Sequence, residues 1–127
     1  MSHYSTISVN LDDEASIKAA CNELDLKFRL NSKVKGYYGA GESCDIVIEI
    51  KGSPYEVGLR RNGKGGYDLI YDKFGGHVEK VLGKDCKKLV ESATYHKVTK
   101  TARKLGYMIQ RKDKTGGGIQ VILSRAG

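Results

Sequence analysis

The fold of this chain is decided by residues 45–71, DIVIEIKGSPYEVGLRRNGKGGYDLIY. Residues 45–50 are rich in β-branched side chains, and residues 55–60 alternate between apolar and polar positions, as a half-buried strand does. Pro54 lies in a turn signal between these two strands, and the glycine-rich residues 62–66 mark a second turn before the closing YDLIY. We therefore predict three antiparallel strands in succession.

Further strands and helices are predicted on both sides of this segment. The order β-α-β-β-β-β-α-β-β predicts an α+β fold, with residues 1–127 as a single domain. It consists of a mainly antiparallel sheet with two helices on one face. The outer elements are a strand at 6–11, a helix capped by Asp12 or Asp13, a strand at 26–30, a helix from about Lys84 to Leu105 that Gly106 ends, and a hairpin of residues 107–110 and 119–123.

Positive charge is concentrated in the second part of the chain. The net charge is +7 over 127 residues, yet residues 1–50 hold five Lys/Arg against eight Asp/Glu, whereas residues 51–127 hold seventeen against seven. Clustered cations raise the local concentration of anions, so the asymmetry suggests an anionic partner on one side of the molecule. The alternative is that the charge serves solubility alone.

The chemistry-bearing side chains form no recognisable catalytic or metal motif. Cys21, Cys44 and Cys86 are odd in number and widely spaced, so neither a disulfide framework nor a zinc site is predicted. The three histidines are scattered, and the glycine clusters lack the spacing of a phosphate-binding loop. We expect no catalytic residue, metal or cofactor. With no signal peptide or membrane span, we expect a soluble, unprocessed cytoplasmic protein.

The predicted C-terminal helix carries a cationic face. At about 100° per residue, Lys97, Lys100 and Lys104 share one face, and His96 and Arg103 lie beside them. Such a face can contact phosphates, with salt-dependent binding, or pair with an acidic protein surface. The alternative is a solvated face whose lysines keep the helix soluble.

The opposite side of the same helix is predicted to pack. Val98, Thr101, Ala102 and Leu105 fall there, with Tyr95 at the rim. The buried stripe shifts around the helix near Tyr95, because the apolar positions further upstream are displaced by about a quarter turn.

A second candidate contact is the segment Gly36-Tyr37-Tyr38-Gly39. It lies in residues 34–41, which we predict to be a flexible loop, and Lys33 and Lys35 are close by. Adjacent tyrosines next to cations have the composition used to hold single strands or flipped-out bases. The alternative is that Tyr37 and Tyr38 fold back to cover the edge of the sheet.

Four segments resemble a known family, the conserved open-reading-frame family number thirty-five of algal plastids and cyanobacteria, which also occurs in other bacteria and phages. The segments are residues 1–7, 36–39, 67–75 and, above all, Tyr95-His96-Lys97-Val98. The resemblance implies a stand-alone soluble protein of unknown function, encoded in some genomes near an AAA-plus ATPase. It also implies aromatic residues at positions 72–75, of which this chain keeps only Phe74.

Three functions follow as hypotheses. The first is a non-catalytic binding module that engages an anionic partner, with nucleic acid favoured, through Lys97, Lys100, Arg103 and Lys104, and with Tyr37 and Tyr38 as a second contact. The second is a protein adaptor or assembly factor that acts with an AAA-plus ATPase. The third is an enzyme that uses His96 or His77, with or without a tyrosine.

Overall fold

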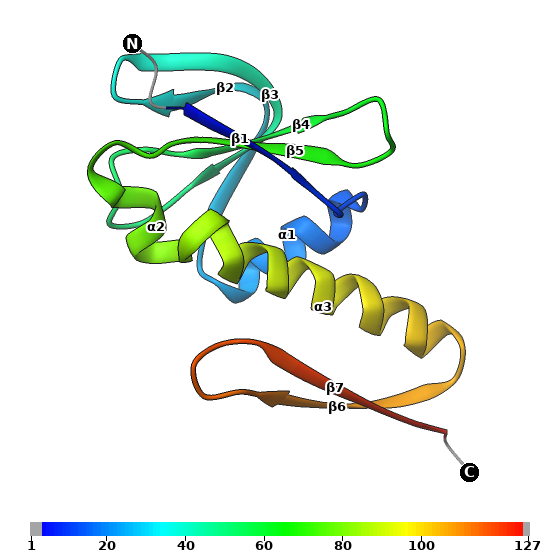
Figure 1. Cartoon of the computed structure of the whole chain (residues 1–127). Coiled ribbons are helices and arrows are strands. Elements are labelled where there is room, and N and C mark those ends of the chain that lie inside the picture. Colours follow the sequence, from blue (N-terminus) through cyan, green and yellow to red (C-terminus); the bar gives the residue numbers. More distant parts are fainter. Residues whose placement is uncertain (1–3, 126–127) are drawn as a thin grey trace.

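The computed structural model describes residues 4–125 as three layers (Figure 1). A five-stranded sheet forms the first layer, helices cover one of its faces, and a two-stranded hairpin lies beyond the longest helix. The predicted α+β class and element order are confirmed. The elements are β1 (Tyr4–Val9), α1 (Glu14–Glu23), β2 (Lys27–Gly36), β3 (Gly39–Glu49), β4 (Val57–Arg61), β5 (Tyr67–Asp72), α2 (His77–Leu82), α3 (Lys87–Lys104), β6 (Tyr107–Asp113) and β7 (Ile119–Arg125).

The main sheet is antiparallel, with strand order β1-β5-β4-β3-β2. Its centre is formed by residues 45–71: Leu59 on β4 lies between Ile46 on β3 and Leu69 on β5. All three side chains are fully buried. The predicted succession of three antiparallel strands is therefore confirmed.

The core fills the space between this sheet and the helices. Ile17 and Ala20 of α1 and Leu89 and Ala93 of α3 are all fully buried against the sheet. Apolar side chains spaced three or four residues apart place one helix stripe on the core, as expected for amphipathic helices. Removing this area from water is the main favourable term in the stability of the fold.

The long β2–β3 hairpin bends over the opposite face of the sheet. Val34 and Cys44 of the hairpin bury Val47 and Ile70 there. Gly58 permits this approach, because a Cβ atom at that position would lie 2.4 Å from the Cys44 sulfur. The predicted flexible loop at residues 34–41 is wrong: both strands continue through it, and only Tyr37 and Tyr38 form the turn. The ladder through that stretch contains a register shift between Lys33 and Lys35 but continues to the turn.

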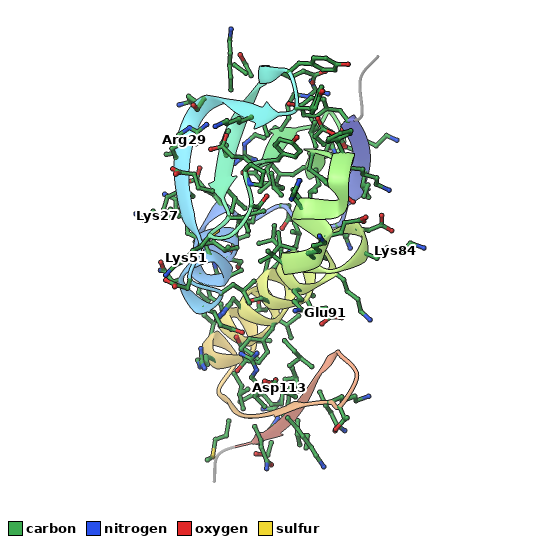
Figure 2. All side chains as sticks on the ribbon, turned by 90° about the vertical axis from the view of Figure 1, so that its left-hand side faces the viewer. Lys27, Arg29, Lys51, Lys84, Glu91 and Asp113 are labelled. Atoms are coloured by element: carbon green, nitrogen blue, oxygen red, sulfur yellow. The ribbon has the colours of Figure 1, made fainter. Side chains whose placement is uncertain are left out.

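Three features differ from the prediction. The short helix α2 begins at His77, which we expected in a loop, and α3 begins at Lys87 rather than near Lys84. The closing hairpin forms a separate two-stranded sheet against α3 instead of joining the main sheet. Figure 2 shows this hairpin below α3, with Glu91 of the helix above it; the Glu91 carboxylate accepts a hydrogen bond from Gly118 N at 3.3 Å.

Candidate functional site

The cationic face of α3 meets acidic side chains of the same chain. Lys100 Nζ lies 2.6 Å from Asp13 Oδ2, and Lys97 pairs with Asp12. His96 Nε2 lies 2.9 Å from Glu23 Oε1. Three of the five contact residues predicted on this helix therefore already have anionic partners within the chain. An external phosphate would have to compete with those carboxylates.

Local helix chemistry explains where those carboxylates lie. Asp13, one of the two residues predicted as the helix cap, is the N-cap of α1, and its side chain accepts hydrogen bonds from Ala15 N and Ser16 Oγ. The hydrogen bond from Lys100 is the main reason that the pKa of Asp13 is lowered. The acidic start of α1 thus lies beside the basic face of α3 and anchors the two helices to each other.

Glu23, at the end of α1, joins three elements. Its two carboxylate oxygens accept hydrogen bonds from Arg111 Nη1 and Nη2, both at 2.8 Å, while Oε1 also contacts His96. The Arg111 guanidinium lies over the Tyr95 ring at 4.4 Å. Glu23 thereby connects α1, α3 and β6, a role that no local sequence motif indicates.

Arg103 and Lys104 differ from the other cations of α3. Within residues 4–125 neither forms an ion pair, and both are exposed. They line a shallow hollow of about 380 Å³ between α1 and α3, together with His96 and Lys100. This pair is the part of the predicted basic site that remains available to a phosphate or a carboxylate.

The predicted apolar side of α3 is only partly packed. Ala102 is buried, as expected, but Val98 is 43% exposed and Leu105 is 64% exposed. The hairpin therefore leaves part of this predicted packing side uncovered. An open apolar groove of about 410 Å³ results, and it is lined by Thr94, Lys97, Val98, Thr101, Ala102, Leu105, Asn10, Tyr107 and Leu123.

Three aromatic rings form an exposed cluster at the other end of the molecule. Tyr37 and Tyr38 occupy the β2–β3 turn, and Phe74 follows β5. The Tyr37 ring lies 4.8 Å from Tyr38 in an edge-on arrangement and 4.4 Å from Phe74, centroid to centroid. The three residues are 49%, 64% and 41% exposed, so the tyrosines do not fold back to cover the sheet edge. We call these three residues the aromatic cluster.

One buried carboxylate positions the aromatic cluster. Asp72 is fully buried, and it accepts hydrogen bonds from Tyr37 N at 2.8 Å and from Phe74 N at 2.9 Å. Gly36 allows the turn to come this close, since a Cβ atom there would lie 2.8 Å from the Asp72 carboxylate. The two segments that carry the rings are therefore fixed to each other.

Three lysines lie close in sequence to the residues of the aromatic cluster. Lys33, Lys35 and Lys73 are all exposed, and within the described residues only Lys73 has an ion pair, a 3.8 Å contact with Asp85. The nearby carboxylate of Glu56 is occupied by Arg29, at 2.6 Å, on the edge strand β2 (Figure 2). The aromatic cluster thus combines stacking surface with positive charge.

The structure does not bring the two predicted contacts together. Along the antiparallel pair β1–β5, Tyr4 opposes Asp72 at one end, and Val9 opposes Tyr67 at the other. The aromatic cluster lies at the Asp72 end, whereas the acidic residues that hold α3 follow Val9. The tyrosines and the basic helix face are therefore separate surfaces.

The remaining histidine and cysteine side chains of residues 4–125 are part of neither surface described above. His77 packs edge-on against Tyr55, with ring centroids 5.2 Å apart. All three cysteines are buried, and burial raises the pKa of Cys21 to about 11 and that of Cys86 to about 12, which disfavours a reactive thiolate. Among residues 4–125, no group of three or more His, Cys, Asp or Glu could hold a metal ion, and no helix is long and apolar enough to cross a membrane.

Comparison with known proteins gives a family without an assigned activity. The family model described as a protein of unknown function (DUF1257) matches residues 20–122. This range includes the aromatic cluster, α3 and most of the hairpin. Searches among curated proteins and among solved structures found no match.

Proposed function

We propose that this chain, which belongs to the DUF1257 family, is a non-catalytic binding module for single-stranded nucleic acid, and that the aromatic cluster is its main contact. The observation that carries the proposal is the fixed geometry of Tyr37, Tyr38 and Phe74 around the buried Asp72. Exposing aromatic rings to water is unfavourable, so an exposed aromatic patch is typical of a binding surface. A buried carboxylate that holds the rings in a fixed arrangement is typical of a preorganised binding site.

The chemistry of the surface fits unpaired bases. A base can stack on an exposed ring whatever its sequence, and each such contact contributes about 1–3 kcal/mol. Lys33, Lys35 and Lys73 supply positive charge for the phosphates beside the stacked bases. Arg103 and Lys104 on α3 form a separate basic patch, which a long strand could reach but a short one could not.

Replacing Tyr38 by Ala should weaken binding of a short single-stranded oligonucleotide about tenfold, because one stacking contact is lost. Changing Tyr37, Tyr38 and Phe74 to Ala together should abolish binding. Fluorescence anisotropy with labelled single-stranded DNA and RNA, repeated over a salt series, measures both effects. A circular dichroism spectrum and a melting curve confirm that each variant is folded.

The matched control removes cations from α3 without breaking an internal ion pair. Arg103→Gln combined with Lys104→Gln should reduce the affinity for a short oligonucleotide only about two- to threefold. Unchanged binding by the triple aromatic variant, together with a large loss in the α3 variant, would move the site to the helix. No binding of either nucleic acid at low salt would refute the proposed function.

A protein adaptor is the second candidate, and the apolar groove beside α3 favours it. Exposed Val98 and Leu105 form the kind of surface that proteins bury against one another. The resemblance to the plastid and cyanobacterial family suggests an AAA-plus ATPase as one partner to test. A complex that survives physiological salt and is lost on Leu105→Glu would support this function, whereas nucleic-acid binding would be unaffected by that change.

A further inference from the structure

We propose that two copies of this chain associate by pairing their β7 strands antiparallel, so that each copy's strand extends over the apolar groove of the other. Three features of the molecule support this pairing: the free edge of β7, the sequence of that strand and the position of the groove. None of the three depends on the proposed nucleic-acid binding.

The β6–β7 sheet has an unprotected edge. In the part of the chain that the structure describes, the sheet has only two strands, so β7 pairs with β6 on one side alone. Proteins usually protect such edges with charged residues. On β6 the charged residues are Arg111, Lys112 and Asp113, but β7 has no charged residue before Arg125.

The sequence of β7 suits pairing with an identical strand. Within residues 120–124 its residue types are symmetric about Ile122: Val121 and Leu123 are apolar, and Gln120 and Ser124 are polar. An antiparallel pair centred on Ile122 therefore places Val121 opposite Leu123 and Gln120 opposite Ser124, with no like charges in contact, and only at the ends of the strand does Ile119 lie opposite Arg125. A two-fold axis makes such an interface self-complementary.

The apolar groove lies where the added strand would run. Arg111 holds β6 on the α1 side of the hairpin, so the free edge of β7 faces the other way. Leu123 and Tyr107 form the hairpin side of the apolar groove. A smaller hollow next to it, also lined by Val98, has Ile119 and Val121 on its hairpin side. A second β7 strand would continue the sheet over exposed Val98 and Leu105 and shield them from water.

Sedimentation equilibrium over a concentration series tests the association. The wild-type protein should show a monomer–dimer equilibrium. Ile122→Lys should raise the dimer dissociation constant at least about tenfold, because the two-fold axis brings two ammonium groups together. The matched control is Gln110→Lys, which adds the same charge at the residue opposite Ile122 on β6 and should leave the constant unchanged.

Cysteine cross-linking tests the register. Ile122→Cys should form an intermolecular disulfide under mild oxidation, since facing residues in an antiparallel pair lie within disulfide range. Gln110→Cys should not, and the three native cysteines are buried. A monomer at every concentration would overturn the proposal and leave the groove to a different protein. A dimer that Ile122→Lys does not weaken, or that Gln110→Cys cross-links equally well, would also overturn it.

Discussion

Asp72→Ala is expected to lower the free energy of unfolding by about 2 kcal/mol. It should also weaken oligonucleotide binding about tenfold, although the variant keeps all three aromatic side chains of the cluster. The wild-type carboxylate accepts the backbone N–H groups of Tyr37 and Phe74, and the alanine methyl group can accept neither. The β2–β3 turn then loses its connection to β5. Binding must afterwards include the cost of ordering the rings.

Urea denaturation measures the first effect, and anisotropy measures the second. The matched control is Asp45→Ala, which removes one carboxylate-to-amide hydrogen bond, from Arg61 N at 2.7 Å, away from the aromatic cluster. It should cost about 1 kcal/mol and leave binding unchanged. If Asp72→Ala destabilises the protein as expected but binds the oligonucleotide like wild type, the aromatic cluster is not the contact surface.

The sheet was predictable because its signals are local. Alternation along residues 55–60 and the turn residues at 62–66 together specify strands and their direction. Asp13 was identifiable as a helix cap for the same reason. The turn at Tyr37 and Tyr38 was missed because Gly36 and Gly39 are typical of loops. Here Gly36 is required by its close approach to Asp72, and Gly39 by its positive φ of 89°.

The state of the basic helix face was not predictable, since it depends on residues far away in the chain. Lys97 and Lys100 pair with Asp12 and Asp13, more than eighty residues earlier. A helical pattern shows which cations share a face, but it cannot show what covers that face. The same limit explains Val98, whose apolar side the hairpin leaves exposed.

The aromatic cluster was half visible in the sequence. Tyr37 and Tyr38 were predicted as a contact because they are adjacent tyrosines between glycines. The resemblance to the plastid family implied aromatic residues in the segment that contains Phe74. Their proximity is a property of the bent β2–β3 hairpin, which crosses the sheet toward β5 (Figure 1). Sheet curvature of this kind has no local sequence signature.

Glu23→Gln is expected to lower the free energy of unfolding by about 1–2 kcal/mol at neutral pH, after allowance for solvent screening. The hydrogen bonds from Arg111, followed by the contact with His96, lower the pKa of Glu23 to about 2. A carboxylate whose pKa is lower in the folded state stabilises the fold above its ordinary pKa. That contribution is lost as the pH falls toward 2.

The difference in unfolding free energy between wild type and Glu23→Gln should therefore be constant above about pH 5 and should shrink as the pH falls from there to about 2. Because Glu23 connects the hairpin to α1 and α3, the variant should also speed hydrogen exchange in β6 and β7. Glu14→Gln on the same helix is the matched control. It breaks only an exposed pair with Lys18 and should cost at most about 0.5 kcal/mol. A pH-independent difference for Glu23→Gln, or unchanged exchange in the hairpin, would show that Glu23 does not hold β6 and β7 against the helices.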